Sequence, residues 1–320
     1  MNNYCTLFNI NYLSRGLNLY NSLEKVSKNF KIYIFAFDDL TFEYLKKAKL
    51  KRAKIISLDE FEDKKLKKVK TERSQTEYFW TCTGSTILYL FKKFKLKSCT
   101  YLDADLFFYK DPKILIDESK SSSCIISKHN YSEGYDQTKT SGIYCVQFMH
   151  FKNNFYGIKI LNEWREQCIK WCFNRFENGK FGDQKYLDDW PKKYQKSVYI
   201  LKNLGGGVAP WNIQKYKLFR NLKLSFKNNS SEKFDLIFYH FHNLKFIDKY
   251  KTYIGGYKID TEIKNKIYKP YLKKIFIIRD KLEKNKQLNQ INFNENFYSG
   301  GIFIIRLIKR FIFKNNFLEI

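Results

Sequence analysis

Apolar residues follow two alternating patterns over the first hundred positions of the chain. Short runs of aliphatic and aromatic residues at 4–8, 31–37 and 53–58 predict buried strands. Between these runs, apolar residues recur at helical spacing over 13–26 and 40–50. Strands that alternate with helices are typical of a parallel sheet, so the pattern predicts a Rossmann-like β-α-β-α-β start.

A fourth strand runs directly into two carboxylates. Helical spacing over residues 76–95 is followed by an apolar run that ends at Asp103-Ala104-Asp105. Ligands of open α/β sheets bind beyond the carboxyl ends of the strands, so we expect these acids to share a cleft with residues 9–12, which follow the first strand. Mg²⁺ and Mn²⁺ prefer carboxylate oxygens and leave other positions to water and phosphate. The alternative is a pair of solvated polar residues at a strand end.

The second half of the chain mixes strands and helices. Residues 143–149 and 198–201 predict buried strands, and 155–176 predict a helix rich in aromatic residues. A later apolar strand ends in His240 and His242. A histidine there is either a satisfied core residue or an imidazole that completes an oxygen-rich metal site.

Two short segments that contain glycine, 182–191 and 205–207, are candidates for a functional role. Within residues 182–191, Asp183 can be the N-cap of a short helix that Pro191 would end. The run at 205–207 is three glycines, which let backbone approach a ligand closely. It lacks the spacing of a phosphate-binding loop, so a plain turn is the alternative.

The chain is strongly basic. Its 59 Lys and Arg residues against 32 Asp and Glu give a net charge of +27, which would attract phosphates, nucleic acid or anionic lipid. The heavy use of Lys, Asn, Ile, Phe and Tyr equally fits an A/T-rich genome with no polyanion partner. At 320 residues the chain is long enough for one large domain or two modest ones.

Seven cysteines form no C-x-x-C motif and no paired framework, which predicts reduced thiols in a cytosolic protein. Cys168 and Cys172 lie one helical turn apart, where they would bind metal or belong to a packed helix face with Trp164 and Trp171. The first residues lack the basic and apolar regions of a secretory signal. No apolar run reaches the roughly 18 residues of a membrane-spanning helix.

Several motifs occur in the order found in GT-A glycosyltransferases, and the chain resembles glycosyltransferase family 8 in particular. The motifs are Tyr101-Leu102-Asp103-Ala104-Asp105, Ser141-Gly142-Ile143, Asp183-Gln184, Pro210-Trp211-Asn212 and His240. Longer strings around residues 81–83, 181–191 and 205–212 are similar to those of a closer group of bacterial proteins. The resemblance implies an α/β fold of the GT-A type, a mixed sheet flanked by helices. It covers a domain at 1–250, and 251–320 would be a basic helical extension.

The resemblance also implies a metal and a nucleotide-sugar donor. Asp103 and Asp105 would hold Mn²⁺ or Mg²⁺ against the diphosphate of a UDP-sugar, with His240 as the third protein ligand. Asn243 departs from the family's His-x-x-Gly pattern, which leaves His242 as a competing ligand.

Further residues of the donor site are carried over from the same resemblance. The implied cofactor-binding residues are Asn9, Asn11, Tyr12, Ala104, Ser141 and Gly142, with Tyr12 available to stack on the base. Asn9 replaces an acidic residue of the family. Arg73, at the start of the helix predicted before the two acids, is a further candidate for a phosphate contact.

The implied catalytic residues are Asp183 and Gln184, which would face the donor sugar and the acceptor. Family 8 implies retention at the anomeric carbon. An inverting enzyme would need a base, for which Asp183, Asp188 and Asp189 are all candidates.

The last seventy residues differ in character. Residues 251–320 contain 15 Lys and Arg and 6 Asp and Glu, a local net charge of +9. Basic residues of 301–314 fall on one side of a predicted helix whose other sides are apolar, as in helices that lie on an anionic membrane. A helix packed on the domain with a solvated basic edge is the alternative.

The sequence therefore predicts a metal-dependent glycosyltransferase acting on a bacterial surface glycan or lipo-oligosaccharide. We expect it in the cytoplasm, peripheral on the inner face of the membrane, with no specific nucleic acid as partner. A nucleic-acid-binding protein would use the +27 charge and the aromatic residues, but no zinc-finger spacing or RNA-binding motif is present. A phosphatase using the Asp-x-Asp pair and an inactive glycan-binding module remain alternatives.

Overall fold

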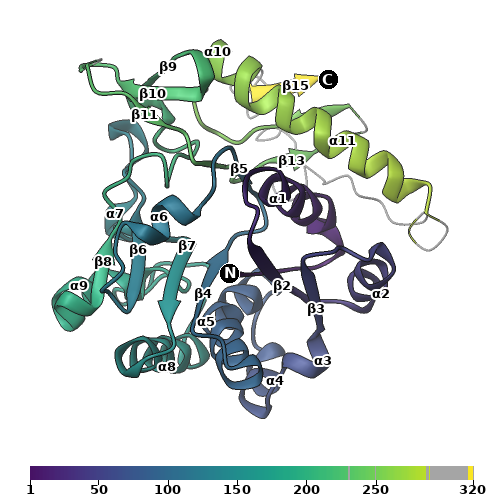
Figure 1. Ribbon diagram of the computed structural model, residues 1–320, viewed down its shortest axis with the longest axis vertical. Helices are drawn as coiled ribbons and strands as arrows, with labels where there is room; N and C mark the ends of the chain where they lie inside the picture. The colour runs from purple at the N-terminus through teal and green to yellow at the C-terminus, as the bar shows by residue number, and fades with distance from the viewer. Residues whose placement is uncertain (230, 249, 286–287, 289–315, 320) are drawn as a thin grey trace.

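A seven-stranded mixed sheet forms the centre of the computed structural model, which describes residues 1–229, 231–248, 250–285, 288 and 316–319 (Figure 1). The strand order is β3-β2-β1-β4-β7-β6-β8. Its strands are β1 Asn2–Phe8, β2 Phe30–Ala36, β3 Ala53–Ser57, β4 Ser98–Leu102, β6 Cys124–Lys128, β7 Tyr144–Lys152 and β8 Val198–Ile200. The first four are parallel, and β7 runs antiparallel to both of its neighbours. The predicted α/β class, a mixed sheet flanked by helices, is confirmed.

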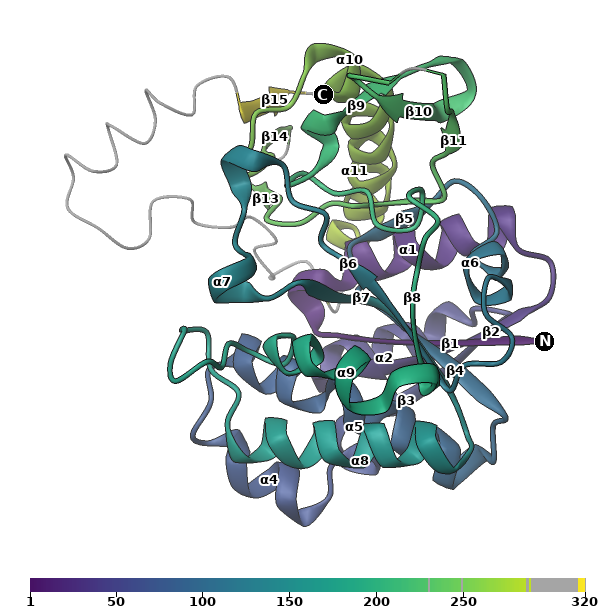
Figure 2. The ribbon, with the colours of Figure 1, turned by 90° about the vertical axis from the view of Figure 1, so that its left-hand side faces the viewer.

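Helices cover both faces of this sheet. The α-helices are α1 Leu13–Val26, α2 Asp39–Ala48, α3 Leu58–Phe61, α4 Lys64–Lys70, α5 Gln75–Phe94, α6 Lys113–Asp117, α7 Thr138–Ser141, α8 Phe155–Lys170, α9 Trp190–Tyr194, α10 Thr261–Ile263 and α11 Lys269–Glu283. Figure 2 shows α4, α5 and α8 on one side of the sheet and α1 and α11 on the other. Alternate residues of β1 enter the two cores, Cys5 and Leu7 on the α5 side and Tyr4 and Phe8 on the α1 side. Burial on both faces explains why these strands are almost continuously apolar.

Close packing brings α1 down onto β1. Gly16 lies so near Phe8 that a Cβ at this position would be 2.3 Å from the ring. A larger residue would push the helix away from the strand that precedes the cleft, because the aromatic ring in the core has little room to move. The first turn of α1 is thereby fixed next to the segment that ends β1.

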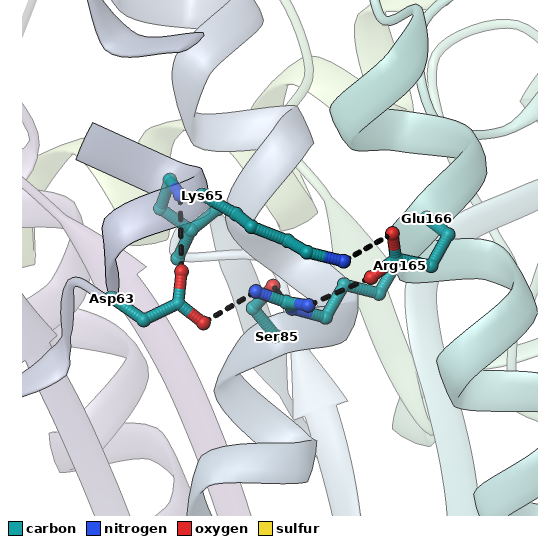
Figure 3. Close-up of polar contacts among 6 residues, drawn as sticks. Asp63, Lys65, Ser85, Arg165 and Glu166 are labelled. Carbon is teal, nitrogen blue, oxygen red and sulfur yellow. Dashed lines mark hydrogen bonds and ion pairs between the residues drawn. The ribbon is translucent and has the colours of Figure 1, made fainter. Parts of the chain in front are cut away.

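Polar contacts fasten the helices of the other face to one another (Figure 3). Arg165 of α8 donates to Ser85 of α5 at 3.0 Å and to Asp63, the N-cap of α4, at 2.5 Å. Lys65 of α4 pairs with Glu166 at 2.7 Å. Exposed ion pairs such as the second contribute little stability, so the partly buried Arg165 is the main polar link of the three helices.

The predicted helix at 155–176 is six residues too long. Helix α8 ends at Lys170, and Trp171 is extended, which turns Cys172 into the core. The chain then forms a tight hairpin, in which Glu177 and Lys180 exchange two backbone hydrogen bonds. Asn178 and Gly179 at its tip have φ of 49° and 75°, the conformation that Asn-Gly favours. The Asn178-Gly179 turn therefore determines the structure of this segment, although its aromatic residues recur at helical spacing up to residue 176.

Short antiparallel sheets complete the structure. They contain β5 Leu106–Phe108 with β12 Phe238–His240, β9 Tyr216–Leu218 with β10 Lys223–Phe226 and β11 Phe234–Asp235, and β13 Lys245–Phe246 with β14 Lys251–Tyr253 and β15 Phe317–Glu319. The proposed domain boundary at residue 250 falls between the paired strands β13 and β14. Described residues on its two sides pack in one core, in which Phe241 stacks on Tyr271 at 3.5 Å between centroids.

The predicted amphipathic segment 301–314 lies outside the described residues, so its role as a membrane anchor stays a prediction. Within the described part of the chain, no helix combines the length and apolar character needed to cross a membrane. All seven cysteines are buried free thiols. Cys168 and Cys172 lie in the core with Trp164, but only Cys168 lies on α8, so the predicted packed helix face does not extend to Cys172.

Acid sensitivity is expected from the histidines in the core. His150 of β7 is 4% exposed, its Nδ1 lies 2.8 Å from Thr100 Oγ1, and burial, with a smaller effect of Lys152, lowers its pKa to about 4. The unfolded chain takes up this proton near pH 6.5. Because the pKa of His150 is lower in the folded state, its contribution to the free energy of unfolding is complete above pH 6.5 and is lost as the pH falls toward 4. Between pH 7 and pH 5 the expected loss for this residue is about 2 kcal/mol.

Urea unfolding of the chelator-treated protein at pH 7 and pH 5 tests this effect. His150→Asn should be less sensitive to pH than the parent protein, whatever its stability at pH 7. The same loss of stability in both proteins would show that His150 does not remain neutral in the folded state.

Candidate active site

A cleft of about 660 Å³ lies at the carboxyl ends of β1 and β4. Its walls come from segments far apart in the chain: the turn after β1, one side of α5, the turn after β4, residues 181–184 and the residues around the end of β12. The predicted site residues that line it are Asn9, Asn11, Tyr12, Asp103, Ala104, Asp105, Ser141, Asp183, Gln184, His240 and His242. The structure thus brings together most of the residues predicted from the sequence.

Asp103, Asp105 and His240 form a candidate metal centre. One ligand atom from each lies within 4.8 Å of the others, and no second group of this kind occurs in the described part of the chain. His240 Nε2 is 2.9 Å from Asp105 Oδ1 and 3.8 Å from Asp103 Oδ2. Two carboxylates and an imidazole fit a divalent ion such as Mn²⁺, and Asp103 remains partly exposed to the cleft.

Strand pairing places His240 at this centre. β5, which begins directly after Asp105, pairs antiparallel with β12, and Leu106 lies opposite His240. The other ring nitrogen, Nδ1, lies 2.8 Å from Gln147 Oε1 on β7. A proton on Nδ1 would be donated to this amide oxygen, which turns Nε2 toward the carboxylates.

His242 takes a different position. Its ring is 5.6 Å from the ring of His240 and 5.3 Å from that of Trp211. Burial, and next the charge of His240, lowers the pKa of His242 to about 4. Of the two competing histidines, the structure places His240 against the two carboxylates.

The three ionisable groups strongly affect one another. Burial opposes charge on Asp105, but His240 outweighs it and lowers the pKa of the carboxyl to about 2. Burial raises the pKa of Asp103 to about 6, with His240 opposing and Asp105 adding to the rise. The two carboxylates raise the pKa of His240 well above its usual value in spite of burial. Without a bound cation, the imidazolium therefore compensates the charge of Asp105.

Asp183 lies in the same cleft with an unsatisfied oxygen. Its Oδ2 is buried and has no hydrogen-bond partner, whereas its backbone carbonyl accepts from Trp164 Nε1 at 2.8 Å. Burial and then the charge of Asp103 raise the pKa of Asp183 to about 8, although Thr83 hydrogen-bonds the carboxyl. The neighbouring Gln184 donates to Ser141 O at 2.8 Å. The acid therefore holds a proton at neutral pH and keeps one buried oxygen without a hydrogen-bond partner.

The alternative role of Asp183 as a helix cap is wrong. A 3₁₀ helix covers Lys185–Asp189, its N-cap is Gln184, and no side chain caps it. Pro191 lies in the first turn of α9, where it opens that helix instead of ending one. Proline is tolerated in a first turn because its missing N–H would have no intrahelical partner there.

The segment after β1 forms another part of the cleft wall. Asn9 is buried, donates to Gln75 Oε1 at 2.9 Å and keeps Oδ1 without a partner. Asp38 accepts from the backbone N–H of Ile10 at 2.7 Å and thereby shapes the turn. Tyr12 is 37% exposed, which leaves part of its ring open to a ligand.

Two predicted residues do not line the cleft. The guanidinium of Arg73 lies over Phe173 at 3.9 Å and donates to Ile169 O, so Arg73 packs between helix ends instead of reaching a phosphate. Gly142 has φ of 104°, and its carbonyl lies 3.1 Å from His129 Nδ1. Its contribution is a turn that only glycine adopts without strain.

The glycine run also serves packing. A Cβ on Gly205 would lie 1.9 Å from Asp235 O, and one on Gly206 would lie 2.5 Å from Leu115. Neither residue lines the cleft. The run is therefore a closely packed turn, one of the two alternatives that the sequence left open.

Sequence reasoning missed Gln147, and it gave no role in the site to Trp211 and Asn212 of the motif Pro210-Trp211-Asn212. Gln147 is fully buried within the apolar β7. Trp211 donates to His129 O at 2.9 Å and packs beside His240 and His242. Asn212 donates to the carbonyls of His129 and Gly207, each at 2.8 Å. The sequence did contain one signal for Gln147: it is a polar residue inside an otherwise apolar strand. A buried amide of this kind needs a hydrogen-bond partner, which indicates a contact with another polar group.

The fold and this site define an α/β protein with a candidate divalent-metal centre at the carboxyl edge of its sheet, where phosphate-bearing ligands bind in such folds. The chain belongs to the same family as the protein YfnF of Bacillus subtilis (strain 168). The two are 30% identical over 253 residues, which cover 76% of this chain and 82% of YfnF. YfnD of the same organism is 27% identical over 278 residues, 84% of this chain and 87% of YfnD. Both are named as uncharacterized proteins, so this membership carries no activity with it.

No protein-family model matches the sequence. Among solved structures, the chain is similar to the apo form of mouse xyloside xylosyltransferase 1, with a TM-score of 0.47 and 11% identity over 76% of this chain and 98% of the other. A complex of the galactosyltransferase LgtC with donor and acceptor sugar analogs also has a TM-score of 0.47, with 11% identity over 85% and 95%. The glycosyltransferase GlyE of Streptococcus pneumoniae TIGR4 has a TM-score of 0.42, with 14% identity over 63% and 45%.

Proposed function

We propose that this protein is a metal-dependent glycosyltransferase of the GT-A type that transfers a sugar from a nucleotide diphosphate sugar to a glycan acceptor. The observation that carries the proposal is the convergence of Asp103, Asp105 and His240 in a cleft that Asn9, Asn11 and Tyr12 also line. Two carboxylates at the carboxyl edge of an α/β sheet are suited to a divalent cation and a phosphate-bearing ligand together.

Asp103, Asp105 and His240 would hold Mn²⁺ or Mg²⁺. When bound, such an ion neutralises negative charge that develops on a departing diphosphate. Gln147 orients His240 for this role through the contact with Nδ1. The burial of Asp105 and His240 keeps water from weakening their electrostatic effect.

The charge distribution of the cleft supports a metal-bound ligand over a free polyanion. Although 59 of the 320 residues are Lys or Arg, none of the described residues that line the cleft is one of them. The phosphates of a nucleic acid would need cationic side chains at each contact. A diphosphate that arrives with its own divalent ion does not, which favours a nucleotide sugar.

The residues that line the cleft suggest where the substrate parts would lie. Asn11 and the partly exposed ring of Tyr12 suit a nucleoside, and we propose that it is the uridine of UDP. Asp183 and Gln184 would face the donor sugar and the acceptor. The similarity to family 8 in the motifs supports retention at the anomeric carbon and an acceptor that is a bacterial surface glycan.

Thermal stabilisation by nucleotides tests the proposal. The melting temperature is measured with a panel of nucleoside diphosphates and their sugars, in Mn²⁺ and again with excess chelator. A ligand at a hundred times its Kd stabilises the folded state by about 2.7 kcal/mol. We expect a clear upward shift with a uridine nucleotide that disappears with chelator. No shift with any nucleotide in Mn²⁺ would refute the proposed function.

A further inference from the structure

Arg15, in the first turn of α1, links the two segments that form one end of the cleft. It is 2% exposed. One terminal nitrogen donates to Asn11 O at 3.2 Å, and the other donates to Leu244 O at 2.7 Å. Asn11 belongs to the turn after β1, and Leu244 follows His242 and Asn243, which line the cleft. A single guanidinium therefore ties together loops that are 229 residues apart in the chain.

The same guanidinium is stacked between two aromatic rings. Its carbon lies 4.3 Å from the ring centroid of Tyr12 and 4.6 Å from that of Phe246. On α11, Arg279 lies over Phe246 at 4.3 Å. Figure 1 shows α1 and α11 side by side at this end of the molecule, where they are also in direct contact. The column Tyr12, Arg15, Phe246 and Arg279 thus runs from the cleft into the core.

We propose that Arg15 is a positioning residue for nucleotide binding, which holds the ring of Tyr12 and the segment 242–244 in the arrangement that receives the nucleoside. The inference rests on the proposed function, because it places the nucleotide against Tyr12. A planar guanidinium can donate in two directions within its plane while it lies over aromatic rings, as Arg15 does with Tyr12 and Phe246. A preorganised ring binds its ligand without first losing conformational freedom.

This role predicts a selective defect in Arg15→Lys. Lysine keeps the charge but loses the flat surface and the fixed donor geometry. We expect the Kd of UDP in saturating Mn²⁺, measured by calorimetry, to rise by about tenfold, the equivalent of about 1.4 kcal/mol. The affinity for Mn²⁺ alone, followed by electron paramagnetic resonance, should change by less than about twofold, because lysine keeps the positive charge that acts on Asp105.

Arg279→Lys is the matched control. Arg279 is also 2% exposed and also lies over Phe246, but its second aromatic contact is Phe276 of its own helix, at 6.0 Å. We expect this variant to lose thermal stability while its Kd for UDP stays within about twofold of the parent. If Arg15→Lys does not fold, Phe246→Leu removes one face of the stack and should raise the Kd for UDP by about threefold, again without affecting Mn²⁺.

The outcomes separate the inference from the function on which it rests. Unchanged UDP affinity in Arg15→Lys, or equal losses of UDP and Mn²⁺ affinity, would overturn the positioning role while leaving the transferase proposal intact. An equal loss of UDP affinity in Arg279→Lys would likewise show general packing instead of positioning. Absence of UDP binding by the unaltered protein in Mn²⁺ would count against the proposed donor before any variant is compared.

Discussion

Replacement of Asp105 with asparagine is expected to reduce sugar transfer by at least roughly 1,000-fold, the size of effect that follows when a central electrostatic group of an active site is removed. Asp105 Oδ1 is the carboxylate oxygen nearest to His240 Nε2, at 2.9 Å. The amide is neutral and binds a hard divalent ion far less well than a carboxylate does. The variant should therefore also lose Mn²⁺ binding.

The fold should survive this substitution. The asparagine side chain has the shape of the aspartate that it replaces, and Asp105 lies in a turn between β4 and β5 instead of within the sheet. His240 loses the stronger of the two carboxylate effects that raise its pKa, so its pKa falls while Asp103 remains beside it. Circular dichroism and the melting temperature of the metal-free protein establish that the variant is folded.

Asp111→Asn is the matched control for the metal centre. Asp111 follows Asp105 by six residues, accepts a hydrogen bond from the backbone of Lys113 and does not line the cleft. An asparagine can accept the same bond, so transfer and Mn²⁺ affinity should be unaffected. Full activity of Asp105→Asn, with Mn²⁺ still bound, would refute the assignment of this residue as a ligand.

Asp183→Asn is expected to lower transfer by about 100-fold or more while making the metal-free protein more stable. The loss of rate is within the range found for groups that exchange protons or hydrogen bonds with a substrate. The gain in stability follows from the raised pKa of about 8. A substitution that raises stability and strongly lowers activity is uncommon. The combination would identify Asp183 as a residue whose role is in function and not in folding.

The sign of the stability change follows from proton uptake. An aspartate in the unfolded chain loses its proton near pH 3.9. Asp183 keeps its proton up to about pH 8 in the folded state, so folding stability falls as the pH rises between these values. Asp183→Asn should therefore raise the free energy of unfolding by a few kcal/mol at pH 7 and should leave it almost unchanged at pH 4.

Urea unfolding of chelator-treated protein at pH 4, 5.5 and 7 measures the effect. Asp189→Asn provides the control, since Asp189 is exposed and belongs to the same segment. Neither its stability nor its rate of transfer should change. If Asp183→Asn gains nothing at pH 7, the carboxyl is ionised in the folded protein. If it retains full activity, Asp183 does not face the substrates.

Local patterns in the sequence were sufficient for most of the sheet and for the two carboxylates. The helix predicted at 13–26 is α1 with the same bounds, and the strand before Asp103 is β4. Hydrophobic periodicity reports which side of an element is buried, and that depends on neighbours three or four positions away. Polar residues that end such a strand are then placed at the ligand-binding edge by topology alone.

The tertiary structure decided which residues meet at the site. The choice between His240 and His242 depended on the pairing of β12 with β5, and the loss of Arg73 from the site depended on its contact with Phe173. Gln147 and Arg15 act through partners 93 and 229 residues away. The sequence by itself therefore determined the elements and the chemistry at their ends, while side-chain roles that depend on distant strands and loops required the folded chain, because no local period encodes contacts across the molecule.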